Sequence, residues 1–402
     1  MSPREYVARD PRTGQRIGKR GRRKKSSTGV GALMPDPGPW QSVPIEGIVP
    51  LAKSEVEKIE VRTDSGKWTL GRIDAIKGLH RVLDRDAEEA YEALVEALED
   101  DFPDVRIAGL KSLPSFSLRR QGILIQCLSD RILDEVSAVS EEAMECLKKV
   151  APVFPSGCVE ILRRELRSEE AKRRGSAFEA LRLAAKEWPE VGCLHLDELI
   201  REDELDLRVR GSKILRTIAA KGGAEAWDLI GWSLRDEDSR VRRSAAQTLP
   251  ILAEVEPRIA AILVEGSMGE NDRGARKYII TALKKLDMQS HRVTSMIMKG
   301  AVDEDIEMRR ACISQLTIIM SGQELREAAG ELLKTETDES LKKRLNALAM
   351  DPDFEGTEQE KNRKLAPLDS PHEEEKGALQ ETPPLREYDK RQSGRPASED
   401  RQ

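Results

Sequence analysis

Residues 236–249 read DEDSRVRRSAAQTL, a run that puts acids first, then arginines, then small residues and finally a leucine. The same order of residue types returns at steps of 33 or 34 residues on both sides of Val241. The anchors of these segments are Val105, Val139, Arg173, Leu207, Val241, Ala275, Met308 and Leu341. A fixed period of this length predicts a repeat architecture in which each unit is one small supersecondary element.

Each anchor begins an apolar stripe with the period of a helix. Eight residues after the anchors stand Leu113, Leu147, Leu181, Leu215, Leu249, Leu283, Leu316 and Ala349. Eleven residues before them stand Leu94, Leu128, Leu162, Leu196, Ile230, Val264, Ile297 and Gly330. Because offsets of 4, 8 and 11 fall on one helical face, each repeat is predicted to hold two amphipathic helices, a preceding helix A and a helix B at the anchor. Stacked helix pairs of this kind form a solenoid.

Two charged columns flank the anchors of the last six repeats. The acids three residues before the anchor are Glu170, Glu204, Asp238, Asp272, Asp305 and Asp338. The bases one residue after it are Arg174, Arg208, Arg242, Arg276, Arg309 and Lys342. An acid at this position can cap the N-terminus of helix B. It also lies four residues before its base, which is the spacing of an ion pair within a helix.

The pattern D-x-x-V-R-x-x-A-x-x-x-L resembles HEAT repeats, in particular the short HEAT-like or PBS-lyase-type repeats, over about residues 87 to 350. The resemblance implies an all-α, right-handed α-solenoid of about eight two-helix repeats. It also implies that the Asp and Arg columns, Asp238 with Arg242 and their equivalents, form a hydrogen-bonded ladder that links successive units. Such arrays serve many roles, so the pattern specifies a fold and no activity.

Changes in composition divide the chain into four parts. Residues 1–50 are predicted to be a disordered basic arm, 51–86 an N-terminal cap, 87–352 the solenoid and 353–402 a disordered polar and acidic tail. The cap contains a lone segment like helix B at 69–83 and a hairpin around a D-S-G turn. The basic cluster of the arm consists of Lys19, Arg20, Arg22, Arg23, Lys24 and Lys25.

The sequence indicates no catalytic residue, cofactor or metal site. The four histidines form no ligand pattern, and the five cysteines lack any regular spacing, which is typical of core cysteines in a reducing compartment. No run approaches 18 apolar residues, so no transmembrane segment is expected. We therefore expect a cytoplasmic protein, or a nuclear one if the source has a nucleus and the arm acts as an import signal. The oligomeric state cannot be read from the chain.

Charge separates the two helices of each repeat. The eight helix B windows carry a net charge of +14, and the other segments of residues 86–353 carry −25. In HEAT-like solenoids helices B line the concave face, so the resemblance implies a basic groove. The expected exposed contributors, which are our candidate partner-binding residues, are Lys148, Arg182, Arg216, Arg243, Lys277, Lys284, Arg310 and Lys343.

Two hypotheses of function follow. The first is a non-catalytic scaffold or adaptor whose basic concave face binds a protein partner that carries an acidic segment. The alternative is a nonspecific nucleic-acid-binding protein that uses the arm together with the groove; few aromatic residues lie near the basic stripe, so base stacking is not expected. Two further readings stay open: a face that serves only solubility, and a HEAT-like lyase that acts on a bound chromophore or protein.

Overall fold

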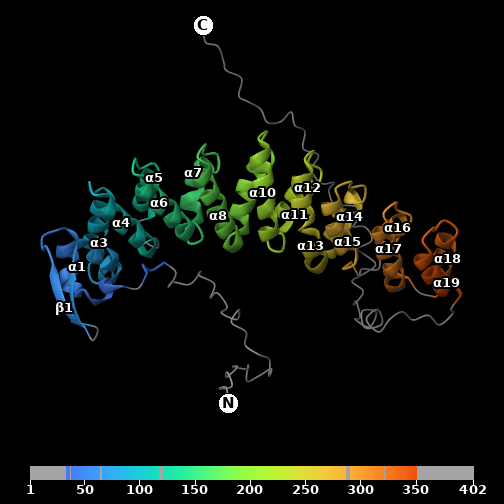
Figure 1. The fold of residues 1–402 in the computed structure, drawn as a ribbon, viewed down its shortest axis with the longest axis horizontal. Coiled ribbons are helices and arrows are strands. Elements are labelled where there is room, and N and C mark those ends of the chain that lie inside the picture. Colours follow the sequence, from blue (N-terminus) through green and yellow to red (C-terminus); the bar gives the residue numbers. More distant parts are fainter. Residues whose placement is uncertain are drawn as a thin grey trace, which may run out of the picture. The chain divides into compact units, whose positions relative to one another are not determined.

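The computed structural model describes residues 33–36, 38–63, 66–116, 121–286, 290–320 and 322–350. Within this part of the chain the helices follow one another in pairs, one pair for each predicted repeat (Figure 1). The predicted fold class, an α-solenoid of eight two-helix repeats, is therefore confirmed. The basic cluster at 19–25 and the predicted tail at 353–402 lie outside the described residues.

The helices A are α3 (Ala87–Leu98), α5 (Gln121–Ile132), α7 (Pro155–Leu166), α9 (Pro189–Ile200), α11 (Gly223–Ser233), α14 (Pro257–Ser267), α16 (His291–Gly300) and α18 (Gly322–Leu333). The helices B are α4 (Pro103–Phe116), α6 (Ser137–Val150), α8 (Ala171–Glu187), α10 (Leu205–Ile218), α12 (Ser239–Ala246) with α13 (Leu249–Val255), α15 (Arg273–Leu283), α17 (Ile306–Ile319) and α19 (Glu339–Met350).

The apolar columns of the sequence form the core. All seven leucines eight residues past the anchors are buried, and so are seven of the eight anchors. The exception is Arg173, which stands where the other repeats place an apolar side chain. Its guanidinium binds Glu165, which is fully buried, at 2.8 and 2.5 Å. A charged residue occupies this core column because a buried carboxylate needs a partner.

The contacts divide the chain into two compact units, with the boundary between Leu183 and Ala184 in α8. In the first unit, α4 packs against α6 and against α2 (Arg72–Gly78). In the second unit, α10 packs on α12, α13 on α15, α15 on α17 and α17 on α19. Successive helices B therefore lie side by side within each unit, which brings their turns and exposed faces next to one another.

The N-terminal cap begins earlier than the sequence indicates. A 3-10 helix η2 (Pro39–Ser42) and α1 (Ile45–Ala52) precede α2 and a 3-10 helix η3 (Leu79–Val82), so residues 39–50 are folded and do not belong to a disordered arm. The reason is non-local: Trp40 is buried against His80 with ring centroids 5.1 Å apart, and Arg81 donates a 2.7 Å hydrogen bond to the Val43 carbonyl.

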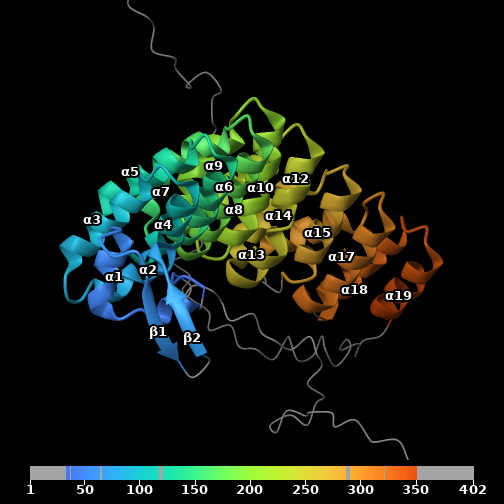
Figure 2. The ribbon, with the colours of Figure 1, turned by 60° about the vertical axis from the view of Figure 1, so that its left-hand side comes forward.

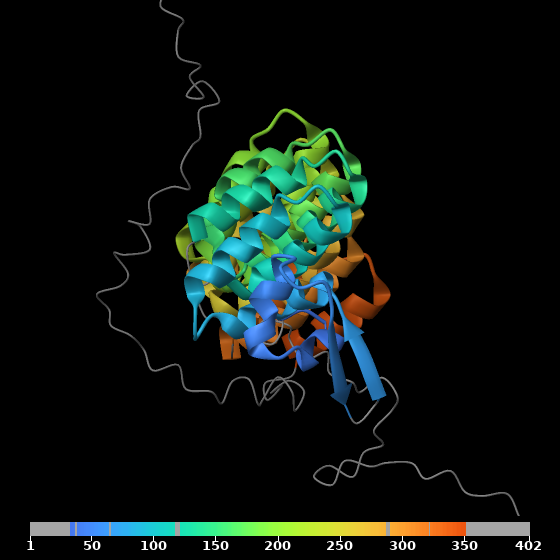
Figure 3. The same cartoon turned by 90° about the vertical axis from the view of Figure 1, so that its left-hand side faces the viewer.

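The predicted hairpin is present between α1 and α2. Strands β1 (Ile59–Thr63) and β2 (Gly66–Leu70) pair antiparallel, with Val61 opposite Trp68. Figures 2 and 3 show the hairpin extending away from α1 and α2. Only its last residue, Leu70, is buried among the residues of β2.

One predicted helix B is two helices. In the fifth repeat α12 ends at Ala246 and α13 starts at Leu249, although the sequence pattern predicts one continuous helix. Pro250 explains the break, since proline has no N–H for the carbonyl of Ala246 and its ring clashes with that carbonyl. Leu249 and Leu252 stay buried, so the core column survives the interruption.

Candidate functional site: the charged turns and faces of helices B

The acids three residues before the anchors cap helices B, as predicted, in the last four repeats. The carboxylate of Asp238 accepts the N–H of Arg240 at 2.8 Å, and that of Asp272 accepts the N–H of Ala275 at 2.8 Å. Asp305 and Asp338 accept backbone N–H groups in the same way. Glu204 is the N-cap residue of α10, but its side chain makes no capping hydrogen bond. Glu170 precedes α8, and its own N–H donates to the hydroxyl of Ser168.

Three of the arginines after the anchors form no ion pair with the acids four residues before them in the described part of the chain. Arg208, Arg242 and Arg309 instead reach a carboxylate in the turn between the helices of the next repeat, 27 or 28 residues further along. We call each such arginine and carboxylate a rung. In the described residues the rungs and their N–O distances are Arg72–Asp100 (2.7 Å), Arg106–Asp134 (3.0 Å), Arg208–Asp236 (3.1 Å), Arg242–Glu270 (2.8 Å), Arg276–Asp303 (2.5 Å) and Arg309–Glu336 (3.0 Å).

Four of the six rungs also hold the turn of their own repeat. Nη1 of Arg242 donates to the carbonyls of Asp236 and Glu237, both at 2.8 Å. Arg106, Arg208 and Arg309 make the same two bonds, always to the carbonyls six and five residues before the arginine. One guanidinium thus fastens two carbonyls of its own turn and one carboxylate of the next turn, a use for which its fork of donors is suited.

The rung carboxylates have a second role. Each accepts the backbone N–H two residues further along, at 2.7–3.0 Å, and the four aspartates among them form turns of the Asx type. Burial opposes ionisation of Glu270, but the hydrogen bonds from Arg242 and from the backbone lower the pKa of this carboxyl below its usual value. The Arg242–Glu270 rung is therefore a charged pair, and the rungs, whose groups are largely shielded from water, tie successive repeats together.

The structure thus corrects which acids form the predicted ladder. The linking acids lie five residues before the anchors, and the acids three before them mostly cap helices. Two links do use the predicted column, because Arg276 also reaches Asp305 at 3.2 Å and Arg243 binds Asp272 at 2.9 and 2.6 Å. Among the remaining bases, Arg174 donates to the Ser168 carbonyl and Lys342 pairs with Glu339. The acids five residues before the anchors were also visible in the sequence. Spacing within one repeat favoured the acids three residues before the anchors, because these lie four residues from the arginine.

Half of the eight candidate partner-binding residues already pair with acids of this chain. Lys148, Arg182 and Arg310 bind glutamates three residues before them, and Arg243 belongs to the link just described. By contrast, Arg216 on α10, Lys277 on α15 and Lys343 on α19 are exposed and have no ion pair within the described residues; Lys284 is also exposed. The structure therefore separates the predicted basic face into paired and unpaired cations.

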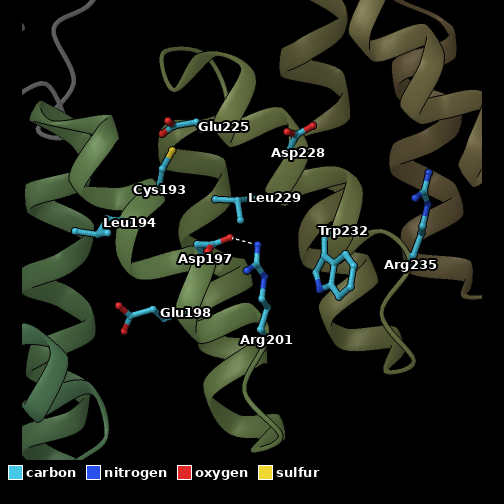
Figure 4. Close-up of a pocket in the computed structure, with 10 residues that line it drawn as sticks. All are labelled: Cys193, Leu194, Asp197, Glu198, Arg201, Glu225, Asp228, Leu229, Trp232 and Arg235. Atoms are coloured by element: carbon cyan, nitrogen blue, oxygen red, sulfur yellow. Dashed lines mark hydrogen bonds and ion pairs between the residues drawn. The ribbon is translucent and has the colours of Figure 1, made fainter. Parts of the chain in front are cut away.

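Sequence reasoning missed a groove between two helices A of the second unit. It has a volume of about 350 Å³ and lies between α9 and α11 (Figure 4). Cys193 and Leu229 are buried at its floor, while Leu194 is 47% exposed. The side chains lining the groove are Cys193, Leu194, Asp197, Glu198, Arg201, Glu225, Asp228, Leu229, Trp232 and Arg235.

The groove is acidic as well as apolar. Asp197 pairs with Arg201 across one turn of α9 (Figure 4), whereas Glu225 and Asp228 on α11 have no ion pair within the described residues. Burial, followed by the nearby Glu225, raises the pKa of the Cys193 thiol to about 11. The thiol is therefore neutral at physiological pH, and the groove offers apolar contact and carboxylates without a nucleophile.

The five cysteines are buried and none forms a disulfide. Within the described ranges no three His, Cys, Asp or Glu side chains gather closely enough to hold a metal ion. In the same part of the chain, every helix is too short or too polar to cross a lipid bilayer.

The described residues thus form a protein of stacked helix pairs whose turns are joined by arginine–carboxylate rungs. No family model and no curated protein matches the chain. Among solved structures it resembles Kap121p, with a TM-score of 0.43, 12% identity, and coverage of 76% of this chain and 37% of Kap121p. It also resembles Kap95p from a complex with RanGDP, with a TM-score of 0.40, 13% identity, and coverage of 78% and 45%. The chain spans less than half of the length of these structures.

Proposed function

We propose that the protein is a non-catalytic helical-repeat scaffold that binds an acidic segment of a protein partner on its helix B face. The observation that carries the proposal is the set of exposed cations Arg216, Lys277 and Lys343, which lack an acidic partner in the described residues. They lie on α10, α15 and α19 of one compact unit. Unpaired surface charges of one sign attract a partner of the opposite sign without first breaking an internal ion pair.

The pattern of pairing favours a protein over a nucleic acid. A nucleic-acid backbone presents closely spaced charges and is bound by many cations at once. The rung arginines are committed to carboxylates and carbonyls, and Lys148, Arg182, Arg243 and Arg310 each have an acid of their own. The few separated cations that remain suit a short acidic segment better than a continuous phosphate track.

The groove between α9 and α11 adds a second docking surface to this proposal. It combines exposed Leu194 and half-buried Trp232 with unpaired carboxylates, a composition that fits an apolar side chain flanked by a cation. A scaffold with faces of opposite charge can hold two partner segments of different chemistry.

The test uses the full chain and a labelled poly-glutamate peptide as the acidic probe, measured by fluorescence anisotropy over a salt series. The variant R216E/K277E/K343E reverses the charge of these three unpaired cations. Its control, K221E/K299E/K334E, makes the same change of charge at three exposed lysines of the same unit outside helices B. We expect at least about tenfold weaker binding for the first variant and less than about twofold for the control. Equal loss in both would overturn the proposal.

A labelled DNA duplex in the same titrations tests the alternative. Micromolar binding that falls steeply with salt, and that is lost in R216E/K277E/K343E, would assign the face to nucleic acid.

A further inference from the structure

One junction in the first unit lacks its rung. The position that carries the rung arginine is Ser140, and the position of the facing carboxylate, five residues before the next anchor, is Ser168. Ser140 donates to the carbonyl of Ile132 at 2.7 Å, and Ser168 accepts the N–H of Glu170 at 3.3 Å. Both turns therefore keep their local hydrogen bonds, but no guanidinium from the described residues joins them.

The acceptors of the missing guanidinium are still in place. In four other repeats the arginine binds the carbonyls six and five residues before it, which correspond here to Asp134 and Glu135. No side-chain donor from the described residues bonds these two carbonyls. A cavity of about 590 Å³ opens at this place, and both residues line it together with Ser140 and Glu170.

The cavity also has the charge that a cation requires. Six carboxylates and three cationic side chains line it. Lys172 is taken by Glu141, and Lys111 lies 3.7 Å from Glu142, whereas Glu135 and Glu170 have no ion pair within the described residues. The carbonyls of Asp134 and Glu135 and the carboxylate of Glu170 are the kinds of acceptor that bind the guanidinium of an ordinary rung, with the carboxylate here three residues before the anchor instead of five.

We propose that this vacant rung is a guanidinium-binding site, and that an arginine from residues 1–32 of the same chain occupies it. That segment holds seven arginines and only two acids, so its charge complements the cavity. A segment of 32 residues can extend about 100 Å, which is long compared with one compact unit. Covalent attachment also gives its arginines an effective concentration on the order of millimolar, enough to favour a contact that is weak between separate molecules. This inference does not depend on the partner proposed above.

The site is specific for arginine rather than for any cation. A guanidinium presents several donors in one plane and can satisfy two carbonyls and a carboxylate together, as Arg242 does. A lysine ammonium is a compact charge without that fork. The experiment therefore needs one variant that fills the site and one that changes arginine to lysine while keeping the charge.

The experiment measures the mobility of the N-terminal segment in the full chain. The five native cysteines are buried, so the added cysteine of S27C can be labelled selectively with a nitroxide. S140R/S168D fills the site with a guanidinium of the chain itself, and R4K/R9K/R12K/R16K/R20K/R22K/R23K changes all seven arginines of residues 1–32 to lysine. The control is A347R, which adds one exposed arginine on α19.

We expect the mobile component of the paramagnetic resonance spectrum to rise about twofold or more in S140R/S168D and in the lysine variant, and to stay unchanged in A347R. Equal spectra in all four proteins would overturn the proposal. Release in S140R/S168D without release in the lysine variant would overturn the specificity for guanidinium. A mobile fraction that rises on dilution of the unsubstituted chain would assign the occupant to a second copy and overturn the intramolecular assignment.

Discussion

Two adjacent arginines on α17 provide a direct test of the rungs. Arg309 forms a rung with Glu336 at 3.0 Å, and its side chain is 14% exposed while that of Glu336 is 2% exposed. Arg310 pairs with Glu307 on the surface, where the two side chains are 48% and 56% exposed. The variants R309M and R310M remove the same charge from neighbouring positions and keep a similar aliphatic stem.

The expected costs differ because the surroundings differ. R309M removes the partner of a buried carboxylate and leaves the carbonyls of Asp303 and Glu304 without the donor that binds them at 2.9 and 3.0 Å. Breaking one side of a buried ion pair costs about 3–5 kcal/mol, and Glu336 keeps backbone N–H donors that offset part of this. We therefore expect R309M to lower the free energy of unfolding by about 2–4 kcal/mol. R310M should cost less than about 0.5 kcal/mol.

The assay is urea unfolding followed by circular dichroism, combined with hydrogen exchange on α17 and α19. Exchange is included because repeat arrays can unfold in stages, and it reports the local free energy at the altered junction. R309M should speed exchange in α17 and α19 and leave α10 unchanged. If R309M and R310M shift the midpoint equally, the idea that rungs stabilise the stack more than surface pairs is refuted.

Three further predictions concern acid stability, thiols and packing. The hydrogen bond from Arg243 lowers the pKa of Asp272 to about 2, below the ordinary 3.8. The stability that this carboxylate contributes is therefore complete above pH 4 and is lost as the pH falls toward 2. The urea midpoint of the D272N variant should fall less steeply than that of the unsubstituted protein between pH 4 and pH 2. Burial raises the pKa of the Cys158 thiol to about 12, so iodoacetamide should label it only after unfolding, as mass spectrometry of the labelled peptide can show. The variant G192A should lower the free energy of unfolding by about 1–3 kcal/mol, because the new Cβ would lie 2.7 Å from Ala185 Cβ and 2.9 Å from Ile218 Cγ2. The control G330A in α18 adds a Cβ that meets nothing within 4 Å, so it should raise the free energy of unfolding by up to about 1 kcal/mol in the same urea titrations.

What the sequence by itself determined was most of what depends on one or two turns of helix. The period of the anchors set the helix pairs, the leucine column identified the core, and Asp238 and Asp272 marked where helices B begin. These features follow from the geometry of a helix and its first turn, which residues within about a dozen positions decide.

Only the tertiary structure decided which charges meet. Arg242 binds Glu270 and not Asp238, because its side chain points to the turn of the next repeat and Asp238 is already used by backbone and by Arg240. The groove between α9 and α11 and the burial of Trp40 were out of reach for the same reason. A carboxylate 28 residues away has no fixed direction from its arginine until the helices between them have packed.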